Sequence, residues 1–474
     1  MKKFLAIILA LVMVFSLAAC GSDGGKDKDD DDKDGGSTAI GGIKLVEEKK
    51  LSEDLSVIAS NGVLGQYIWG ETTTTYKFAN MDGEFVNSTE YSDYFSNHVY
   101  DRYIHVTPVG SRLFGVLDTQ TGMEIVPCEA VSSTSLSARY EVFCYSTGEA
   151  TEETAFGSYW AEDGSTVYYS GYAKIFDYEK GRFVPNITIT GDSSLFFGNR
   201  TFVFETLNDG RVNAYNSDGA IIGTYYDVEY LSDSNIFLAE DTYIDSFTDP
   251  DRFVVVGVDG QIVGTVAQRM SVYSLLSGTD KYIRQNSSAY TTDQEFLTDL
   301  NGNVISAGFD VDIVDLIADK YIMTSDYNSE TGKYNNGVYN LDGSELITPE
   351  WDDIYYYDGY FVTRKGRSYD DSKYTLFDST GKKISKKEYS GHNGVILYDH
   401  DDDENISTVL FLNGSEKKLD YYVGEKIGDL VNVGNSLFDA NTGKKLLDDM
   451  SLFFYRDGKY YVKTMQQVIV YTAK

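Results

Sequence analysis

The chain has 474 residues, with 74 acidic and 40 basic side chains and a formal net charge of −34. Proteins that bind nucleic acid need a basic surface for its phosphates, so this charge argues against a nucleic-acid partner. It also argues against direct electrostatic docking on anionic lipid. Tyr is abundant, with 39 residues, and Pro is rare, with 5, and Tyr-rich runs between Gly and Asp turns indicate an all-β protein.

Residues 1–19 have the pattern of a secretory signal peptide: two early lysines, then an apolar run from Phe4 to Val14. The following LAAC at residues 17–20 resembles the lipobox of bacterial lipoproteins. The resemblance implies cleavage before Cys20 and lipidation of its sulfur. The expected location is therefore the cell membrane, with a lipid anchor on the extracytoplasmic face. An uncleaved transmembrane anchor is the alternative, although the apolar run is shorter than the roughly 20 residues of a span.

Residues 20–42 are expected to form the lipidated cysteine and a disordered acidic tether. Gly, Ser, Asp and Lys dominate this segment, and such a composition buries too little apolar surface to fold. The remaining residues, 43–474, are expected to form one repeat region.

A strand–turn–strand unit recurs through this region, and its best-preserved copy is Gly337–Ile354. Its Asp342-Gly343 pair between two apolar runs predicts a hairpin with a tight primed turn, because glycine adopts positive φ without steric cost. Five consecutive gaps between turn glycines, from Gly181 to Gly381, lie between 38 and 42 residues. A period of about 40 residues is typical of a four-stranded propeller blade. The predicted turn glycines are Gly83, Gly122, Gly181, Gly219, Gly260, Gly302, Gly343, Gly381, Gly414 and Gly443.

These units predict an all-β fold, a β-propeller-like array of four-stranded antiparallel units. The sequence leaves open the number of blades and the choice between one ring and two. The long interval before Gly181 predicts an insertion over residues 132–170. The last unit stops after three strands, so residues 43–51 or 55–58 are expected to pair with residues 468–471. Such pairing would remove two exposed strand edges.

Two copies resemble the repeat of the bacterial WG (KWG) family. That repeat reads Trp-Gly, an apolar pair, Asp or Asn, a turn glycine, an apolar pair, often Pro, and an acidic–apolar pair. Residues 115–127 and 337–354 follow it, with Phe114 and Asn336 in place of the tryptophan. The resemblance covers most of residues 67–447. It implies an extracytoplasmic repeat domain that presents binding surfaces, with no catalytic residues to carry over.

The sequence contains no zinc-hydrolase histidine pair, serine-hydrolase elbow, P-loop or dinucleotide fingerprint, so we expect no enzyme activity. The four histidines are expected to be scattered on the surface. Cys128 and Cys144 predict either a disulfide or two buried free thiols.

The densest acidic cluster is DHDDDE at residues 399–404, in which Asp399, Asp401 and Asp403 are candidate calcium ligands. A solvated acidic loop is the alternative. No other cofactor is expected.

Three functions remain open. The first is a membrane-anchored binding or scaffold module for a protein or glycan ligand at the cell envelope. The second is a carbohydrate-active hydrolase or lyase with paired carboxylates in a propeller cavity. The third is a purely structural spacer, which would have no well-formed pocket. Tyrosine clusters such as Tyr355–Tyr357 predict stacking on sugars or packing between units.

Overall fold

The computed structural model describes residues 42–474 with gaps, so Cys20, the signal sequence and nearly all of the tether lie outside it. The gaps are residues 60–61, 72, 86, 97–101, 162–164, 191–194, 231–234, 242–252, 266–275, 277–278, 280, 287–293, 300–302, 330–331, 367, 369–370 and 421.

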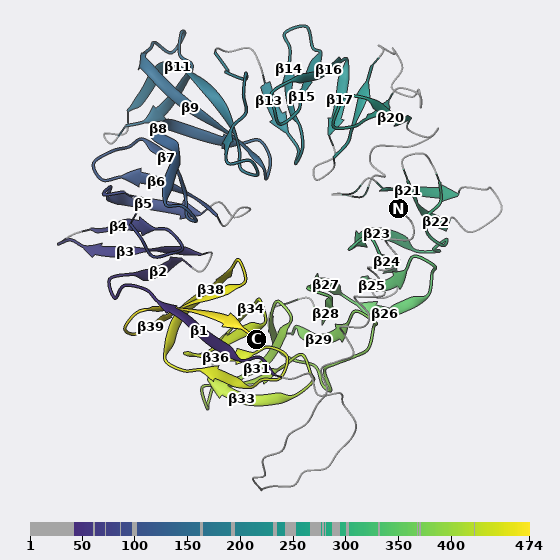
Figure 1. The fold of residues 1–474 in the computed structure, drawn as a ribbon. Coiled ribbons are helices and arrows are strands. Elements are labelled where there is room, and N and C mark those ends of the chain that lie inside the picture. The colour runs from purple at the N-terminus through teal and green to yellow at the C-terminus, as the bar shows by residue number, and fades with distance from the viewer. Residues whose placement is uncertain are drawn as a thin grey trace, which may run out of the picture. The chain divides into compact units, whose positions relative to one another are not determined.

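Every regular element of the described residues is a β-strand, and forty strands form nine antiparallel sheets (Figure 1). Six of these sheets have four strands, which confirms the predicted all-β, propeller-like array of four-stranded antiparallel units. The largest sheet has eleven strands. In chain order they are β2 (Ser56–Ala59), β3 (Val63–Trp69), β4 (Thr74–Ala79), β5 (Tyr91–Ser96), β6 (Tyr103–Pro108), β7 (Phe114–Asp118), β8 (Met123–Ser135), β9 (Tyr140–Glu149), β10 (Gly157–Trp160), β11 (Thr166–Asp177) and β12 (Arg182–Phe183).

The middle of the chain forms four further sheets. Two of them hold β13 (Leu195–Gly198), β14 (Val203–Thr206), β15 (Val212–Tyr215) and β16 (Ile221–Tyr225), then β17 (Asp227–Tyr230), β18 (Phe237–Glu240), β19 (Val254–Val256) and β20 (Ile262–Thr265). The next two hold β21 (Lys281–Asn286) and β22 (Gln294–Asp299), then β23 (Asp312–Ile317), β24 (Tyr321–Asn328), β25 (Lys333–Asn340) and β26 (Glu345–Trp351).

Four sheets complete the described chain. The first two hold β27 (Asp353–Tyr357), β28 (Tyr360–Lys365) and β29 (Lys373–Asp378), then β30 (Gly391–Asn393), β31 (Ile396–Asp401), β32 (Ile406–Leu410) and β33 (Glu416–Asp420). The other two hold β34 (Val423–Ile427), β35 (Leu430–Val433), β36 (Ser436–Asp439) and β37 (Lys445–Leu447), then β38 (Met450–Arg456), β39 (Lys459–Thr464), β40 (Val468–Ala473) and β1 (Leu45–Lys50).

The Asp342-Gly343 hairpin does not use the primed turn that the sequence predicted, whereas Asp358-Gly359 and Asp457-Gly458 have the positive φ at both positions that such a turn needs. The Asn340 carbonyl accepts a hydrogen bond from the Gly343 N–H, and the Asn340 N–H donates to the Ser344 carbonyl, both at 2.9 Å. Gly343 has φ +84°, whereas Asp342 is not among the residues with positive φ. A type I′ turn needs positive φ at both positions, so this loop is a type I turn followed by a glycine bulge.

A side chain at the start of the turn explains the longer loop. The Asn80 side-chain oxygen accepts the N–H groups of Asp82 at 3.0 Å and Glu84 at 2.9 Å. Asx side chains favour turns because they bond the backbone two residues on. The same contacts recur in two later hairpins. The Asn216 side-chain oxygen accepts the N–H groups of Asp218 and Ala220, and an Asp378 carboxylate oxygen accepts those of Thr380 and Lys382.

The two WG-like copies share a close approach between strands. A Cβ on Gly115 would lie 2.2 Å from the Val126 carbonyl oxygen, and one on Gly337 would lie 2.9 Å from the Pro349 Cβ. The register of β7 on β8 and of β25 on β26 shifts at these glycines. The strand that carries the proline therefore bulges toward a position that only glycine can fill.

The first strand of the described chain pairs with the last, as the sequence predicted. In β1, Leu45 lies opposite Ala473 and Lys50 lies opposite Ile469 of β40. Figure 1 shows the purple β1 against the yellow strands of the last sheet. Leu51 and Leu55 then join Val470 in a core cluster between the last sheet and the first. The pairing completes the last unit to four strands and covers the edge of β40.

Core clusters lie between consecutive sheets, and the tyrosine run of β27 shows why. Tyr355 and Tyr357 pack on the cluster around Val395, whereas Tyr356 packs on the cluster around Phe361. Neighbouring residues of a strand face opposite sides of a sheet, so one tyrosine run serves two cores.

The predicted insertion is narrower than residues 132–170. Strand β9 belongs to the repeat, because Tyr140 and Phe143 are fully buried. The added chain is the hairpin of β10 and the start of β11, in which Trp160 pairs with Thr166.

Candidate functional site

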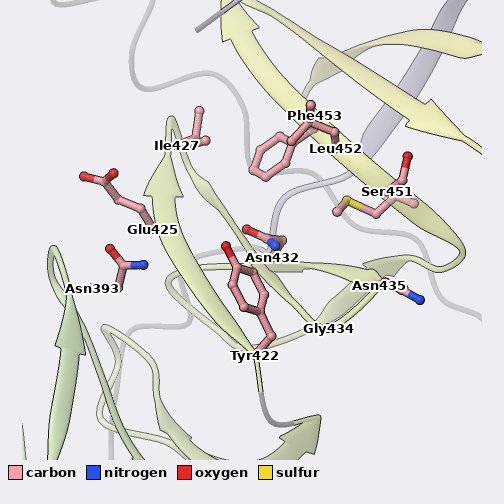
Figure 2. A pocket seen from close by; sticks show the side chains of 11 residues that line it. Asn393, Tyr422, Glu425, Ile427, Asn432, Gly434, Asn435, Ser451, Leu452 and Phe453 are labelled. Atoms are coloured by element: carbon pink, nitrogen blue, oxygen red, sulfur yellow. The ribbon is translucent and has the colours of Figure 1, made fainter. Parts of the chain in front are cut away.

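A pocket of about 460 Å³ lies among β30, β34, β35 and β38 (Figure 2). Its size falls within the range of small-molecule sites, roughly 300–1,000 Å³. Its lining is both polar and apolar: Asn393, Tyr422, Glu425, Ile427, Asn432, Gly434, Asn435, Met450, Ser451, Leu452 and Phe453.

A bulge in β34 shapes this pocket. The register of β34 on β35 shifts between Val423 and Lys426, so Gly424 and Glu425 lie in the irregular stretch. A Cβ on Gly424 would lie 1.9 Å from the Asn432 side-chain oxygen, so a larger residue there would displace that amide. Bulges re-aim side chains in this way. Here the bulge sets the Asn432 amide and the Glu425 carboxylate at the pocket.

Polar groups in the pocket are available to a ligand. Tyr422, whose side chain is 62% exposed, Glu425 and Asn432 make no side-chain hydrogen bond or ion pair with any described residue. Asn393 is held in place, because its amide nitrogen donates to the Val423 carbonyl at 3.4 Å, and its side-chain oxygen remains free to accept. Figure 2 shows Tyr422 and Asn432 turned toward the middle of the pocket, with Phe453 beyond them.

A second cavity of about 260 Å³ adjoins the first through Glu425. It is also lined by Tyr357, Asp358 and Lys426, and the Lys426 ammonium is paired with Asp358 at 3.1 Å. Burial raises the pKa of the Tyr357 phenol, and the negative charge of Glu425 adds to that rise. Glu425 therefore lies between the two cavities and exerts its charge on both.

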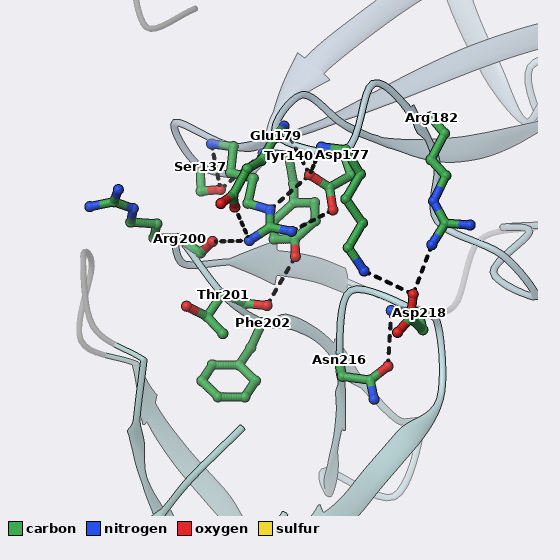
Figure 3. A network of polar contacts seen from close by, with 12 residues as sticks. Ser137, Tyr140, Asp177, Glu179, Arg182, Arg200, Thr201, Phe202, Asn216 and Asp218 are labelled. Carbon is green, nitrogen blue, oxygen red and sulfur yellow. Dashed lines mark hydrogen bonds and ion pairs between the residues drawn. The ribbon is translucent and has the colours of Figure 1, made fainter. Parts of the chain in front are cut away.

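A buried ion-pair network near β9 is already satisfied by protein groups (Figure 3). The Arg139 guanidinium donates to both carboxylate oxygens of Asp177 at 2.7 Å, to the Arg200 carbonyl at 3.2 Å, and pairs with Glu179. The Tyr140 hydroxyl donates to the Thr201 carbonyl at 2.9 Å. These contacts join β9 to the chain before β14, so the network has a structural role.

His105 is buried, contrary to the expectation of surface histidines, and it faces Glu141 and Tyr178. Its Nε2 lies 3.1 Å from a Glu141 carboxylate oxygen, to which the Tyr178 hydroxyl also donates. Burial would raise the pKa of Glu141, but hydrogen bonding and charge from His105 outweigh it, so the pKa is lowered. His98 lies outside the described residues.

The predicted turn glycines serve the backbone of the fold and not a ligand site. Nine of them have φ between +61° and +84°, and Gly302 lies outside the described residues. Several approach the neighbouring sheet, and a Cβ on Gly219 would lie 1.7 Å from the Pro185 carbonyl oxygen. The nine are Gly83, Gly122, Gly181, Gly219, Gly260, Gly343, Gly381, Gly414 and Gly443.

Cys128 and Cys144 are free thiols, so the disulfide alternative is wrong. Cys144 lies opposite Ser132, four positions along β8 from Cys128. The two side chains pack on different core clusters, around Tyr91 and around Ile175 respectively. Burial raises the pKa of Cys128 to about 12, and the negative charge of Glu124 contributes.

The candidate calcium ligands do not converge. Asp399 accepts from the Lys387 ammonium at 2.7 Å, and Asp401 accepts the Glu404 N–H at 3.1 Å. Asp403 lies in the turn between β31 and β32. In the part of the chain that the structure describes, no three His, Cys, Asp or Glu residues are grouped to hold a metal ion.

Comparisons with known proteins give no family. No family model matches the sequence, and no curated protein matches it. Among solved structures, a eukaryotic initiation factor matches with a TM-score of 0.37 and 9% identity, over 85% of this chain and 97% of that one. The Dos1 propeller matches with a TM-score of 0.24 and 10% identity, over 73% and 95%. The C-terminal WD40 domain of Sif2 matches with a TM-score of 0.20 and 10% identity, over 90% and 98%.

The pocket was not predicted from the sequence. Its residues come from segments up to 60 positions apart, Asn393 to Phe453, and form no local motif. Residues 424–434 contain three glycines, but glycines also mark the hairpin turns elsewhere in the chain, so they did not single out this site.

Proposed function

We propose that this protein is a lipid-anchored, extracytoplasmic binding module that takes a glycan of the cell envelope in the pocket around Glu425. The observation that supports this most strongly is the pocket itself, with a free carboxylate, free amides and an exposed tyrosine. Hydroxyl-rich ligands need such donors and acceptors, and an aromatic side chain offers an apolar face. A protein ligand that inserts a polar side chain is the second possibility within this class.

The WG-type repeat supports the surface role. Gly115 and Gly337 occupy the glycine position of the motif, and both lie where the facing strand leaves no room for a Cβ. The motif pattern thus has a physical basis in this chain even though Phe114 and Asn336 replace its tryptophan. We propose that the chain carries a divergent form of this repeat.

The anchor is proposed from the lipobox-like residues 17–20 alone. In a bacterial host fed a labelled fatty acid, wild type should carry label and sediment with membranes. The Cys20→Ser variant should carry none and should leave the membrane fraction. Equal labelling of the two would refute the anchor. Two acyl chains bind membranes stably, whereas one binds only marginally. The described residues include no helix long and apolar enough to cross a membrane.

Binding is tested with residues 43–474 on a panel of envelope glycans. Tyr422→Ala and Asn432→Ala should weaken binding at least tenfold, because each removes a direct contact. Tyr327→Ala is the matched control, since Tyr327 is 55% exposed on β24 and lies outside the pocket. Equal binding by all three variants would refute the proposed site.

The two other functions gain no support. A hydrolase of this kind needs two carboxylates, and Glu425 is the single acidic residue that lines the pocket of about 460 Å³. A further cavity of about 500 Å³ has Asp352 and Asp353 in its lining, but Asp353 is paired with Arg364 and Asp352 accepts the Gly366 N–H at 2.8 Å. Every carboxyl among the described residues whose pKa departs clearly from its usual value has it lowered, as at Asp118 and Asp378. A pure spacer would have no well-formed pocket. We therefore propose binding without turnover.

A further inference from the structure

Glu425 is the only charged side chain in the lining of the pocket of about 460 Å³. Its carboxylate has no hydrogen-bond or ion-pair partner among the described residues, and its nearest cationic neighbour in sequence, Lys426, is committed to Asp358 at 3.1 Å. Its Oε1 lies 3.6 Å from where a Cβ of Gly394 would be, so the tip of the β30–β31 hairpin adjoins it without donating to it. Glu425 is exposed, so its carboxylate is hydrated in the free protein and accessible to a cationic ligand.

The rest of the lining disfavours an anion. No Lys, Arg or His lines the pocket that contains Glu425, Asn432 and Tyr422. The amides of Asn393 and Asn432 offer acceptors and donors to neutral groups, and Tyr422 offers a ring face. The chain as a whole carries −34, which attracts cations and repels acidic ligands at a distance. The pocket therefore fits a ligand that is hydroxylated and carries a positive charge.

We infer that the pocket selects a sugar with a primary ammonium group, which binds the Glu425 carboxylate while the sugar hydroxyls meet Asn393 and Asn432. This inference rests on the proposed function of the pocket as a glycan site. A charge-assisted hydrogen bond is about twice as strong as a neutral one, so the ammonium contributes selectivity. An N-acetylated sugar has no such charge, and a uronic acid meets repulsion from Glu425.

The experiment measures the affinities of residues 43–474 for three tetrasaccharides by calorimetry at low salt. The ligands are a glucosamine tetramer, its N-acetylated form and a neutral glucose tetramer. The glucosamine tetramer should bind roughly ten- to a hundredfold more tightly than the other two, the usual effect of a hydrogen bond to a charged group. Raising the salt concentration should reduce this difference, because ions screen exposed charges.

The variant Glu425→Gln keeps the size and polarity of the side chain and removes its charge. Its affinity for the glucosamine tetramer should fall to that of the N-acetylated form, whose own affinity should change less than about threefold. Glu404→Gln is the matched control, because Glu404 is an exposed carboxylate in the turn before β32, outside the pocket. It should leave all three affinities unchanged.

The outcomes separate the inference from the function on which it rests. Equal binding of the three sugars, unchanged in Glu425→Gln, would overturn the amino-sugar selectivity and leave the glycan site standing. Absence of binding by all three sugars would overturn both. A loss of selectivity in Glu404→Gln as well as in Glu425→Gln would assign the effect to overall charge and overturn the role of Glu425.

Discussion

Two arginine–aspartate pairs in this protein have the same geometry and different burial. Arg139 donates to both oxygens of Asp177 at 2.7 Å, and Arg102 donates to those of Asp118 at 2.8 and 2.7 Å. The Arg139 side chain is 9% exposed and the Arg102 side chain is 47% exposed. Both aspartates are buried and also accept backbone N–H groups of the following turn. The pairs therefore form a matched test of burial.

The perturbation is the charge-neutral substitution Asp177→Asn, compared with Asp118→Asn. Asparagine retains an oxygen for the turn N–H groups, so the main loss is the ion pair. Breaking a buried pair costs about 3–5 kcal/mol, because the remaining charge is uncompensated. Arg139 keeps Glu179 and the Arg200 carbonyl, so we expect the lower end, about 3 kcal/mol. Arg102 reaches water, and we expect about 1 kcal/mol or less.

The assay is hydrogen exchange on residues 43–474, with urea unfolding as a second measure. Repeat arrays can unfold in parts, so a local opening free energy is better defined than a single global value. In Asp177→Asn the opening free energy of β9 and β14 should fall by about 3 kcal/mol. Strand β36, far along the chain, should change little.

Equal losses in the two variants would refute this explanation. It would mean that the turn contacts, which both aspartates make, carry the stability, and that burial of the arginine contributes little. A larger loss in Asp118→Asn would refute it as well.

Three further predictions concern stability. In thermal or urea unfolding, Gly219→Ala should lower the free energy of unfolding by about 2 kcal/mol more than Gly210→Ala. Both glycines have positive φ, but only a Cβ at Gly219 would meet a neighbour, the Pro185 carbonyl oxygen. Removing residues 43–50 should expose the β40 edge, so the protein should unfold more easily and should self-associate in sedimentation experiments. A stable monomer would contradict ring-type closure. Glu141, whose pKa is lowered on folding, contributes stability above about pH 4 that is lost as pH falls further, so Glu141→Gln should flatten acid unfolding curves.

Local chemistry explains what the sequence predicted correctly. Turn glycines such as Gly343 recur because each hairpin needs one residue with positive φ, and their spacing reports the length of a four-stranded unit. Strand closure was predictable for a similar reason, since an incomplete last unit leaves an edge that must be paired. Both features depend on residues close together in the chain or on a simple count of strands.

Other features depended on three-dimensional neighbours. The turn type required the backbone φ of Asp342, which a sequence motif does not determine. The state of the thiols depended on strand register, which sets Cys144 opposite Ser132 and away from Cys128. The burial of His105 depended on Glu141, which lies on a different strand.

The sequence by itself determined the architecture of this protein: a repeated hairpin, an all-β array and the pairing of its first and last strands. Tertiary structure alone decided the candidate site. The bulge at Gly424 sets Glu425 and Asn432 at a pocket whose other wall, β38, follows more than 20 residues later. Side chains that converge from separate sheets leave no periodic trace in the chain, because only packing brings them together.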